Sequence, residues 1–351
     1  MTASAFVSRS LQGLAAAGVL LLTLSIVECA PQPATPIAAR PAPQLCVPKA
    51  TKPSDRFALA HGCITYSDGS EIWAVDPNHP ANQISLGPSH GMTPVAWSRD
   101  GSRILLMEVG NAGTAQEAQD LYVMSADGSQ TRLTSDGRTG DGSFSPDGAK
   151  VVFSRTDDGL YVVDAKGGIP RLIAKSYLAW WLGTPAWSPD GSRIAYTVYL
   201  EGGPDGLTYE IWTVSPDGTN PRRLLDLGEC RASCAGGLAW SPDGSMLAFH
   251  TAQGTGQPAL DFSIYVVRAD GSGLHRINRH SVQPSWSPDG SRIAFSEQQP
   301  FINSASDTSK SGEVFTMAAD GSNVKLVLES HVVVSTAWPP AGWAWNPVVG
   351  T

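Results

Sequence analysis

The feature that most constrains this chain is an internal repeat with two alternating parts. The first part contains Trp-Ser-Pro-Asp-Gly, or a variant of it, followed by an apolar run, and it occurs five times, at 94–107, 142–154, 185–197, 238–250 and 284–296. The second part is apolar and aromatic and occurs six times, at 71–76, 120–129, 160–168, 210–219, 263–272 and 313–322. The aspartates of the first part are 47, 43, 53 and 46 residues apart: Asp100, Asp147, Asp190, Asp243 and Asp289. A repeat of this length with strand signals predicts a propeller blade and not a helical solenoid.

Each copy of the repeat predicts four antiparallel strands. Residues 188–191, Ser-Pro-Asp-Gly, form a tight turn because Ser suits its first position, Pro presets φ at the second and Gly tolerates the last. This turn joins a strand ending at Trp187 to a strand over 193–198. A second turn at 216–218 joins 210–214 to a fourth strand over about 222–225. The strands are apolar on both faces, which predicts that neighbouring blades cover both faces.

The number of blades follows from the unequal number of the two parts. There are six copies of the second part and five of the first, so one innermost strand is missing near residue 57. Residues 344–347, Ala-Trp-Asn-Pro, match 186–189, Ala-Trp-Ser-Pro, and we expect them to complete the first blade from the C-terminal end. The alternative match is Trp338. The predicted fold is an all-β, six-bladed β-propeller of four-stranded antiparallel blades, with seven blades as the alternative.

Composition excludes several classes of protein. The chain has 351 residues, 42% of them hydrophobic, which rules out disorder of the whole chain. The net charge is −8 and no cluster of Lys and Arg stands out, so a nucleic-acid binder is not expected. One segment alone is apolar enough to consider as a membrane span, which excludes a polytopic membrane protein.

The repeat resembles that of the TolB-type β-propeller family, a WD-like family marked by Trp-Ser-Pro-Asp-Gly followed by Ile-Ala-Phe. The resemblance covers residues 57 to 347. The resemblance implies the propeller fold and a binding role at the cell envelope. TolB itself is a periplasmic protein of the Tol–Pal system. TolB carries an additional α/β domain before its propeller, whereas here a tether is expected in that place. The resemblance is specific for fold and weak for function.

The N-terminal part is expected to direct export. Arg9 is the one charged residue before an apolar stretch over 11–27, a pattern typical of a secretory signal. Cys29 follows and resembles the acylated cysteine of a bacterial lipoprotein, although Glu28 stands where a small residue is expected. The alternative is an uncleaved membrane anchor. We expect a signal with a possible lipobox at 1–29, a Pro/Ala-rich tether at 30–54 and the propeller at 55–351.

Export makes disulfides possible. Cys230 and Cys234 lie in one short loop and can pair locally. Cys46 and Cys63 flank the start of the folded region, and a disulfide between them could pin its first strand. This leaves Cys29 as the odd cysteine, beside the signal. A metal site is the alternative for Cys230 and Cys234.

Candidate binding residues lie between the repeated strands. His90, His280 and His331 each precede a tryptophan by six or seven residues, which would place three imidazoles on one rim as possible ligands of a transition metal. Trp180 and Trp181 fall outside the repeat and are candidates for a binding patch. Insertions at 111–119, 199–209, 253–262 and 298–312 all lie between second and third strands, which predicts long loops on the same rim as the histidines.

Two further patterns have simpler interpretations. The repeated aspartates could bind calcium, but their spacing matches no known calcium loop, so we expect them to shape turns. Residues 87–91, Gly-Pro-Ser-His-Gly, match a nucleophile elbow, but a strand and not a helix is predicted to follow.

The sequence favours a non-catalytic scaffold that binds a cell-envelope protein or a peptidoglycan-associated partner and contacts the membrane only through its N-terminal anchor. Two alternatives stay open. One is a propeller enzyme, such as a metal-dependent carbohydrate lyase or hydrolase with its site at the channel mouth; the other is a sensor or adhesin ectodomain. No cofactor is expected for the scaffold.

Overall fold

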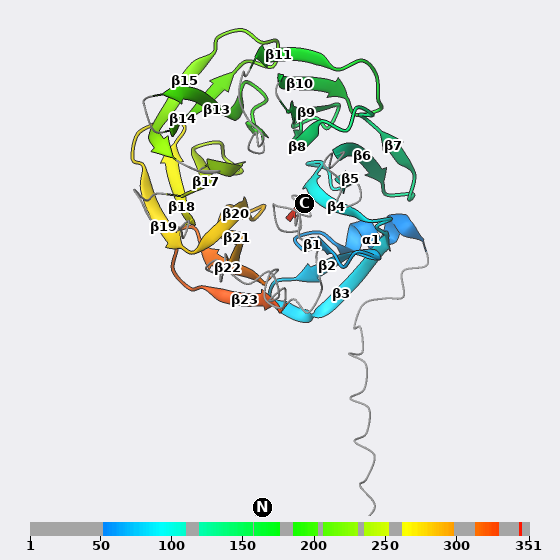
Figure 1. Cartoon of the computed structure of the whole chain (residues 1–351). Coiled ribbons are helices and arrows are strands. Elements are labelled where there is room, and N and C mark those ends of the chain that lie inside the picture. Colours follow the sequence, from blue (N-terminus) through cyan, green and yellow to red (C-terminus); the bar gives the residue numbers. More distant parts are fainter. Residues whose placement is uncertain are drawn as a thin grey trace, which may run out of the picture. The chain divides into compact units, whose positions relative to one another are not determined.

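A computed structural model describes residues 52–109, 119–156, 158–175, 185–202, 206–230, 235–252, 262–297, 313–329 and 344–345. These residues form six four-stranded antiparallel sheets, which are arranged as blades around a central axis (Figure 1). The predicted all-β, six-bladed propeller is therefore confirmed.

Each blade is numbered here by its order along the chain, and its strands are given from the first in the sheet to the last. Blade 1 contains β24 (Ala344–Trp345), β1 (Ile64–Ser67), β2 (Glu71–Asp76) and β3 (His79–Pro88). Blade 2 contains β4 (Met92–Trp97), β5 (Arg103–Val109), β6 (Gln119–Ser125) and β7 (Gln130–Arg132). Blade 3 contains β8 (Thr139–Phe144), β9 (Lys150–Arg155), β10 (Gly159–Asp164) and β11 (Arg171–Lys175).

The other three blades follow the same order. Blade 4 contains β12 (Ala186–Trp187), β13 (Ile194–Gly202), β14 (Gly206–Val214) and β15 (Arg222–Cys230). Blade 5 contains β16 (Ala235–Trp240), β17 (Met246–Ala252), β18 (Phe262–Arg268) and β19 (His275–Arg279). Blade 6 contains β20 (Ser281–Trp286), β21 (Arg292–Glu297), β22 (Val314–Ala318) and β23 (Lys325–Leu328).

The ring closes as the sequence predicts. β24 pairs with β1 through Trp345 opposite Ile64 and Ala344 opposite Thr65. The closing strand thus comes from the C-terminal end, so blade 1 combines the two ends of the propeller. Its tryptophan is Trp345, and the alternative match at Trp338 lies outside the described residues.

The Ser-Pro-Asp-Gly segments are tight turns between the first and second strands. In blade 4, Ser188 Oγ donates to Asp190 Oδ1 at 2.6 Å, and that oxygen also accepts from Ser192 N at 3.0 Å. Ser188 Oγ in turn accepts from Arg193 N at 3.0 Å. These hydrogen bonds to the charged form lower the pKa of Asp190 to about 2. The aspartate oxygens are engaged within their own turns, which confirms the turn-shaping interpretation.

Packing between blades supplies the core. Each large apolar cluster joins residues of neighbouring blades, such as Val152 of β9 with Ile194 of β13. Trp240 Nε1 donates to Ala186 O at 3.1 Å, and Trp286 Nε1 donates to Ala239 O at 3.1 Å, each in the preceding blade. Trp240 and Trp286 therefore stabilise the seams between neighbouring innermost strands. Trp187 Nε1 instead donates to Gly191 O in its own turn, at 3.3 Å.

One element is not predicted by the sequence. Helix α1 (Pro53–Leu59) precedes β1 and begins with proline at its first turn, where a missing N–H costs nothing. Phe57 of this helix is 2% exposed and packs edge-on against Trp97, with ring centroids 5.2 Å apart. The predicted boundary between tether and propeller, at 54/55, lies inside α1. No helix within the described residues is long and apolar enough to cross a membrane.

The predicted insertion at 199–209 differs from the observed structure. β13 and β14 pair continuously from Ile194 opposite Val214 to Gly202 opposite Gly206. Most of the insertion is therefore an extended hairpin and not a loop. Tyr199 and Tyr209 face each other across it, both buried, with ring centroids 4.4 Å apart. Cross-strand aromatic pairing explains why this segment continues the sheet.

Candidate functional site

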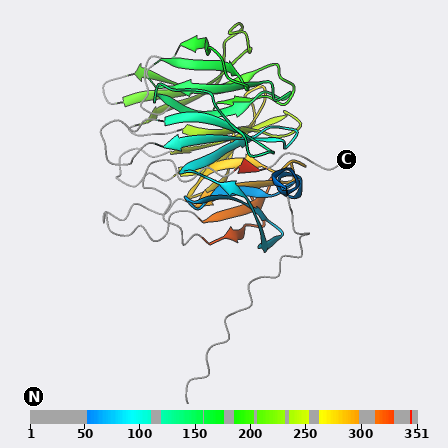
Figure 2. The ribbon, with the colours of Figure 1, turned by 90° about the vertical axis from the view of Figure 1, so that its right-hand side faces the viewer.

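Antiparallel strands divide the ring into two rims. Connections from first to second and from third to fourth strands lie on one rim, which we call the turn rim. Connections from second to third strands, and from a fourth strand to the next blade, lie on the opposite rim, which we call the loop rim. Figure 2 shows the ring from the side, with α1 on the turn rim. All the predicted insertions start from the loop rim.

Two of the three predicted histidines occupy equivalent places on the loop rim. His90 connects β3 to β4 and His280 connects β19 to β20; both are exposed, with φ of 53° and 51°. His331 lies outside the described residues, and because Trp345 closes the ring it stands 14 residues before the closing tryptophan (345 − 331) and not seven. Within the described ranges no group of three or more His, Cys, Asp or Glu side chains could hold a metal ion. The metal site stays a prediction.

The remaining predicted residues are mostly outside the described part of the chain. The structure does not describe Trp180, Trp181, Cys29, Cys46 and Cys234. The backbone of Cys230 pairs with Leu207 at the end of β15. Cys63 is buried, and burial raises the pKa of its thiol to about 12. Both disulfide pairings stay predictions.

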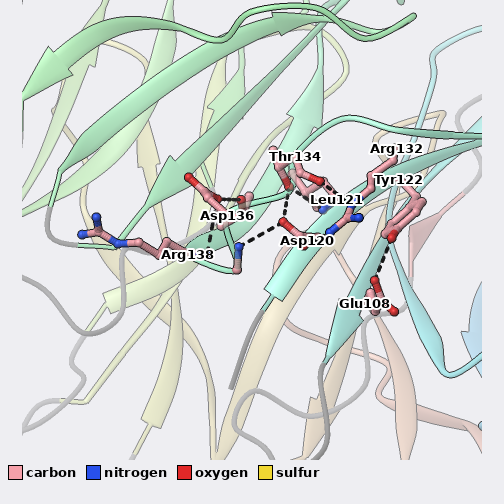
Figure 3. Close-up of polar contacts among 10 residues, drawn as sticks. Glu108, Asp120, Leu121, Tyr122, Arg132, Thr134, Asp136 and Arg138 are labelled. Carbon is pink, nitrogen blue, oxygen red and sulfur yellow. Dashed lines mark hydrogen bonds and ion pairs between the residues drawn. The ribbon is translucent and has the colours of Figure 1, made fainter. Parts of the chain in front are cut away.

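The loop rim carries a network of charged groups at the seam of blades 2 and 3 (Figure 3). Its centre is Asp120, which is 6% exposed at the start of β6. Asp120 Oδ2 accepts from Arg132 Nη2 at 2.7 Å, and Oδ1 accepts from Thr134 Oγ1 at 3.0 Å and Gly137 N at 3.3 Å. Thr134 Oγ1 also accepts from Leu121 N at 2.9 Å. The buried carboxylate thus has a cation and two further hydrogen-bond donors, which compensate its charge.

The network continues into blade 3. Asp136 Oδ2 lies 2.7 Å from Arg155 Nε, and the Arg155 guanidinium lies 4.3 Å from the ring centroid of Tyr161. Arg138 Nη2 donates to Thr156 O at 2.7 Å. Residues of the β7–β8 connection thus hold the end of β9, so the network joins two blades at the loop rim.

Blade 4 has an equivalent arrangement. Glu210 of β14 is 5% exposed, and its Oε1 accepts from Arg223 Nη1 at 2.7 Å. Its Oε2 accepts from Trp212 Nε1 at 2.7 Å. Arg223 pairs in register with Trp212, as Arg132 does with Tyr122 in blade 2. Neither pair is among the residues predicted from the sequence. The signal that could have indicated them is an acid two residues before the third-strand aromatic, with an arginine on the next strand.

A partly buried histidine joins blades 5 and 6. His250 Nδ1 accepts from Gln283 N at 3.1 Å, and its ring packs against Phe262 with centroids 5.6 Å apart. Gln283 has φ of +54° in a bulge of β20, a conformation that strains any residue but glycine. A Cβ atom at Gly237 would lie 2.7 Å from His250 Nδ1, so glycine makes room for the imidazole. Burial lowers the pKa of His250 to about 4, which keeps its Nδ1 an acceptor at neutral pH.

Comparison with known proteins places this geometry in a family. Residues 159–344 match the PD40 family, described as the TolB β-propeller domain. The chain belongs to the TolB β-propeller family. An uncharacterized protein of Agrobacterium fabrum is 32% identical over 187 residues, which cover 52% of this chain and 56% of that protein. The Tol-Pal system protein TolB of Anaeromyxobacter dehalogenans is 33% identical over 118 residues, 34% of this chain and 23% of that protein. The match thus spans about half, or less, of these curated relatives.

Solved structures agree on the fold. A TolB-type structure from Agrobacterium tumefaciens has a TM-score of 0.57 and 26% identity, and the match covers 76% of this chain and 89% of that one. TolB from Acinetobacter baumannii has a TM-score of 0.60 and 17% identity, with coverage of 82% and 67%. The second likeness concerns the fold alone.

The buried or half-buried carboxylates described in this TolB-type propeller hold neighbouring side chains in fixed positions. Asp120, Glu210 and Asp136 are each paired with an arginine, so their charges are already compensated. Ser89, the serine of the nucleophile-elbow pattern, is fully buried between β3 and β4, and its Oγ accepts from Gly91 N at 3.3 Å. It lies in a strand-to-strand turn without the helix that an elbow requires, as the sequence predicts.

Proposed function

We propose that this chain is a non-catalytic scaffold that binds an envelope protein, or a peptidoglycan-associated partner, on its loop rim. The observation that carries the proposal is the repeated carboxylate–arginine pair of blades 2 and 4, Asp120–Arg132 and Glu210–Arg223. In each pair a buried acid fixes a half-exposed guanidinium, with side-chain exposures of 50% for Arg132 and 53% for Arg223. A fixed guanidinium fork presents donors without further loss of side-chain freedom, which favours recognition of a partner surface.

The same proposal places the chain in the envelope. Residues 1–29 act as an export signal, Cys29 receives the lipid, and residues 30–52 form the tether before α1. The chain enters the propeller through α1, on the turn rim. Incorporation of labelled palmitate into the full chain, and its loss in Cys29→Ser, tests this anchor; equal labelling of both would refute it.

Site-specific photo-crosslinking of the full chain in cells tests the binding face. A crosslinking residue would replace Ser135 or Glu297, both exposed near the loop rim, and, as matched controls, Lys166 or Leu274 on the turn rim. The expected result is one protein crosslinked from the loop-rim positions and not from the turn-rim positions. Loss of the cation in Arg132→Gln, at the loop-rim end of β7, should then weaken that crosslink.

Two outcomes would contradict the proposal. Crosslinks from the turn-rim positions alone would mean that the partner binds the turn rim and not the loop rim. A fully folded, exported chain that crosslinks to no protein from either rim would remove the scaffold role and favour the enzymatic alternative.

A further inference from the structure

The outer parts of neighbouring blades contact each other at one repeated point on the turn rim. The glycine of the third-to-fourth strand turn lies against the fourth strand of the preceding blade. A Cβ atom at Gly218 of blade 4 would lie 2.8 Å from Ile173 O, and one at Gly271 of blade 5 would lie 2.6 Å from Leu224 O. Gly321 of blade 6 approaches Ile277 O in the same way, and Gly167 of blade 3 lies against Arg132 O.

The seam between blades 1 and 2 lacks this contact. Gly128 is the equivalent glycine of blade 2, with φ of +86°, but a Cβ atom there would meet nothing within 4 Å. The strand registers place Leu86 of β3 where Ile173, Leu224 and Ile277 stand in the other fourth strands. At this seam the turn of blade 2 is therefore separated from β3.

Helix α1 occupies the position of the missing contact. Phe57 and Ala60, which are 2% and 0% exposed, share one apolar cluster with Leu86 of β3 and Met124 of β6. Arg56 Nη1 donates to Ser85 O at 3.4 Å, on the residue next to Leu86. Ala126, in the same turn as Gly128, packs against this cluster. The helix thus contacts both blades that the glycine contact would otherwise join.

We propose that α1 is a detachable latch that closes the seam between blades 1 and 2. A helix of seven residues is not stable by itself, so α1 is folded only while Phe57 and Ala60 are docked. The chain before residue 52 leads directly into α1, so tension along that chain acts on the latch before it acts on any blade. Release of α1 uncovers the apolar side chains of Leu86 and Trp97 without breaking a strand ladder.

Hydrogen exchange of the full chain, measured by mass spectrometry, tests the latch. Phe57→Ala should raise exchange about tenfold in peptides covering β3 and β6–β7, and leave β18–β19 unchanged. The matched control is Phe153→Ala, a buried phenylalanine in blade 3, which should raise exchange in blade 3 instead. Phe57→Leu is a milder variant that gives the same comparison if Phe57→Ala does not fold.

A peptide of residues 50–62, added to the Phe57→Ala chain, provides a second readout. It should restore protection of β3 and β6–β7, and the same peptide with Phe57→Ala should not. Exchange that rises equally in all six blades, exchange that does not change, or a peptide without effect would each overturn the proposal.

Discussion

Gly271 of blade 5 lies so close to Leu224 of blade 4 that a Cβ atom on Gly271 would be 2.6 Å from the Leu224 carbonyl oxygen. The residue also has φ of +91°, in the left-handed region. Two separate requirements, a backbone conformation and a close approach between blades, therefore coincide at this turn. Gly128 shares the first requirement, with φ of +86°, but not the second.

This difference gives a prediction for two matched substitutions. Gly128→Ala should lower the unfolding free energy by about 1–2 kcal/mol, because the only cost is that of holding alanine in the left-handed conformation. Gly271→Ala should cost about 1–3 kcal/mol more, because the added methyl group must also displace the neighbouring strand. Urea unfolding monitored by tryptophan fluorescence measures both. Equal losses would show that the seam adjusts freely.

The buried serine of each Ser-Pro-Asp-Gly turn should matter more than the exposed serine after it. Ser188 is 1% exposed, donates to Asp190 Oδ1 and accepts from Arg193 N. Ser188→Ala should lower the unfolding free energy by about 1–3 kcal/mol, because it leaves a buried N–H unsatisfied. Ser192→Ala, on the exposed side of the same turn, should change it by about 0.5 kcal/mol or less. Thermal unfolding of both variants would decide, and an equal effect would contradict the role of Ser188.

Asp120 offers a test of the seam between blades 2 and 3. Asp120→Asn removes the charge that holds Arg132 and replaces one acceptor by a donor, so we expect a loss of about 2–4 kcal/mol. Asp127→Asn, in an exposed turn of the same blade, should cost less than about 1 kcal/mol. Chemical denaturation of both variants provides the comparison. A loss at Asp120 no larger than at Asp127 would mean that the network adds nothing to stability.

His250 predicts a dependence of stability on pH. Its pKa is about 4 in the folded chain, against an ordinary value of 6.5, so the unfolded chain binds the proton more readily. Its contribution is therefore present above pH 6.5 and is lost as pH falls from 6.5 to about 4, by about 2–3 kcal/mol in total. Protonation of Nδ1 would also remove the hydrogen bond from Gln283 N.

The matched variant for this test is His250→Ser, because Ser154 and Ser296 stand at the equivalent positions of blades 3 and 6. Unfolding free energies of both proteins would be measured between pH 7 and pH 4. The difference between them should shrink as pH falls. Parallel curves would show that His250 is not the group that titrates.

Features of the fold that depend on residues close together along the chain could be predicted from the sequence. Repeat spacing predicted the blades, because every blade contains the same four strands and the same turns. The match of 344–347 to 186–189 predicted which end closes the ring, and the observed pairing of Trp345 with Ile64 confirms it. The role of the aspartates also followed locally, since Ser188, Asp190 and Arg193 lie within six residues of one another. All these features depend on neighbours along the chain.

The contacts between blades could not be derived in this way. Helix α1 depends on Leu86 and Trp97, and Gln283 keeps its left-handed conformation beside His250, 33 residues earlier in the chain. The sequence predicted a loop at 199–209, whereas the structure has a hairpin there. The two tyrosines that stabilise this hairpin meet only once β13 and β14 pair. The sequence by itself thus determined the repeated unit, its number and its closure. Tertiary structure decided how each seam is filled, because side chains distant along the chain compete there for the same space.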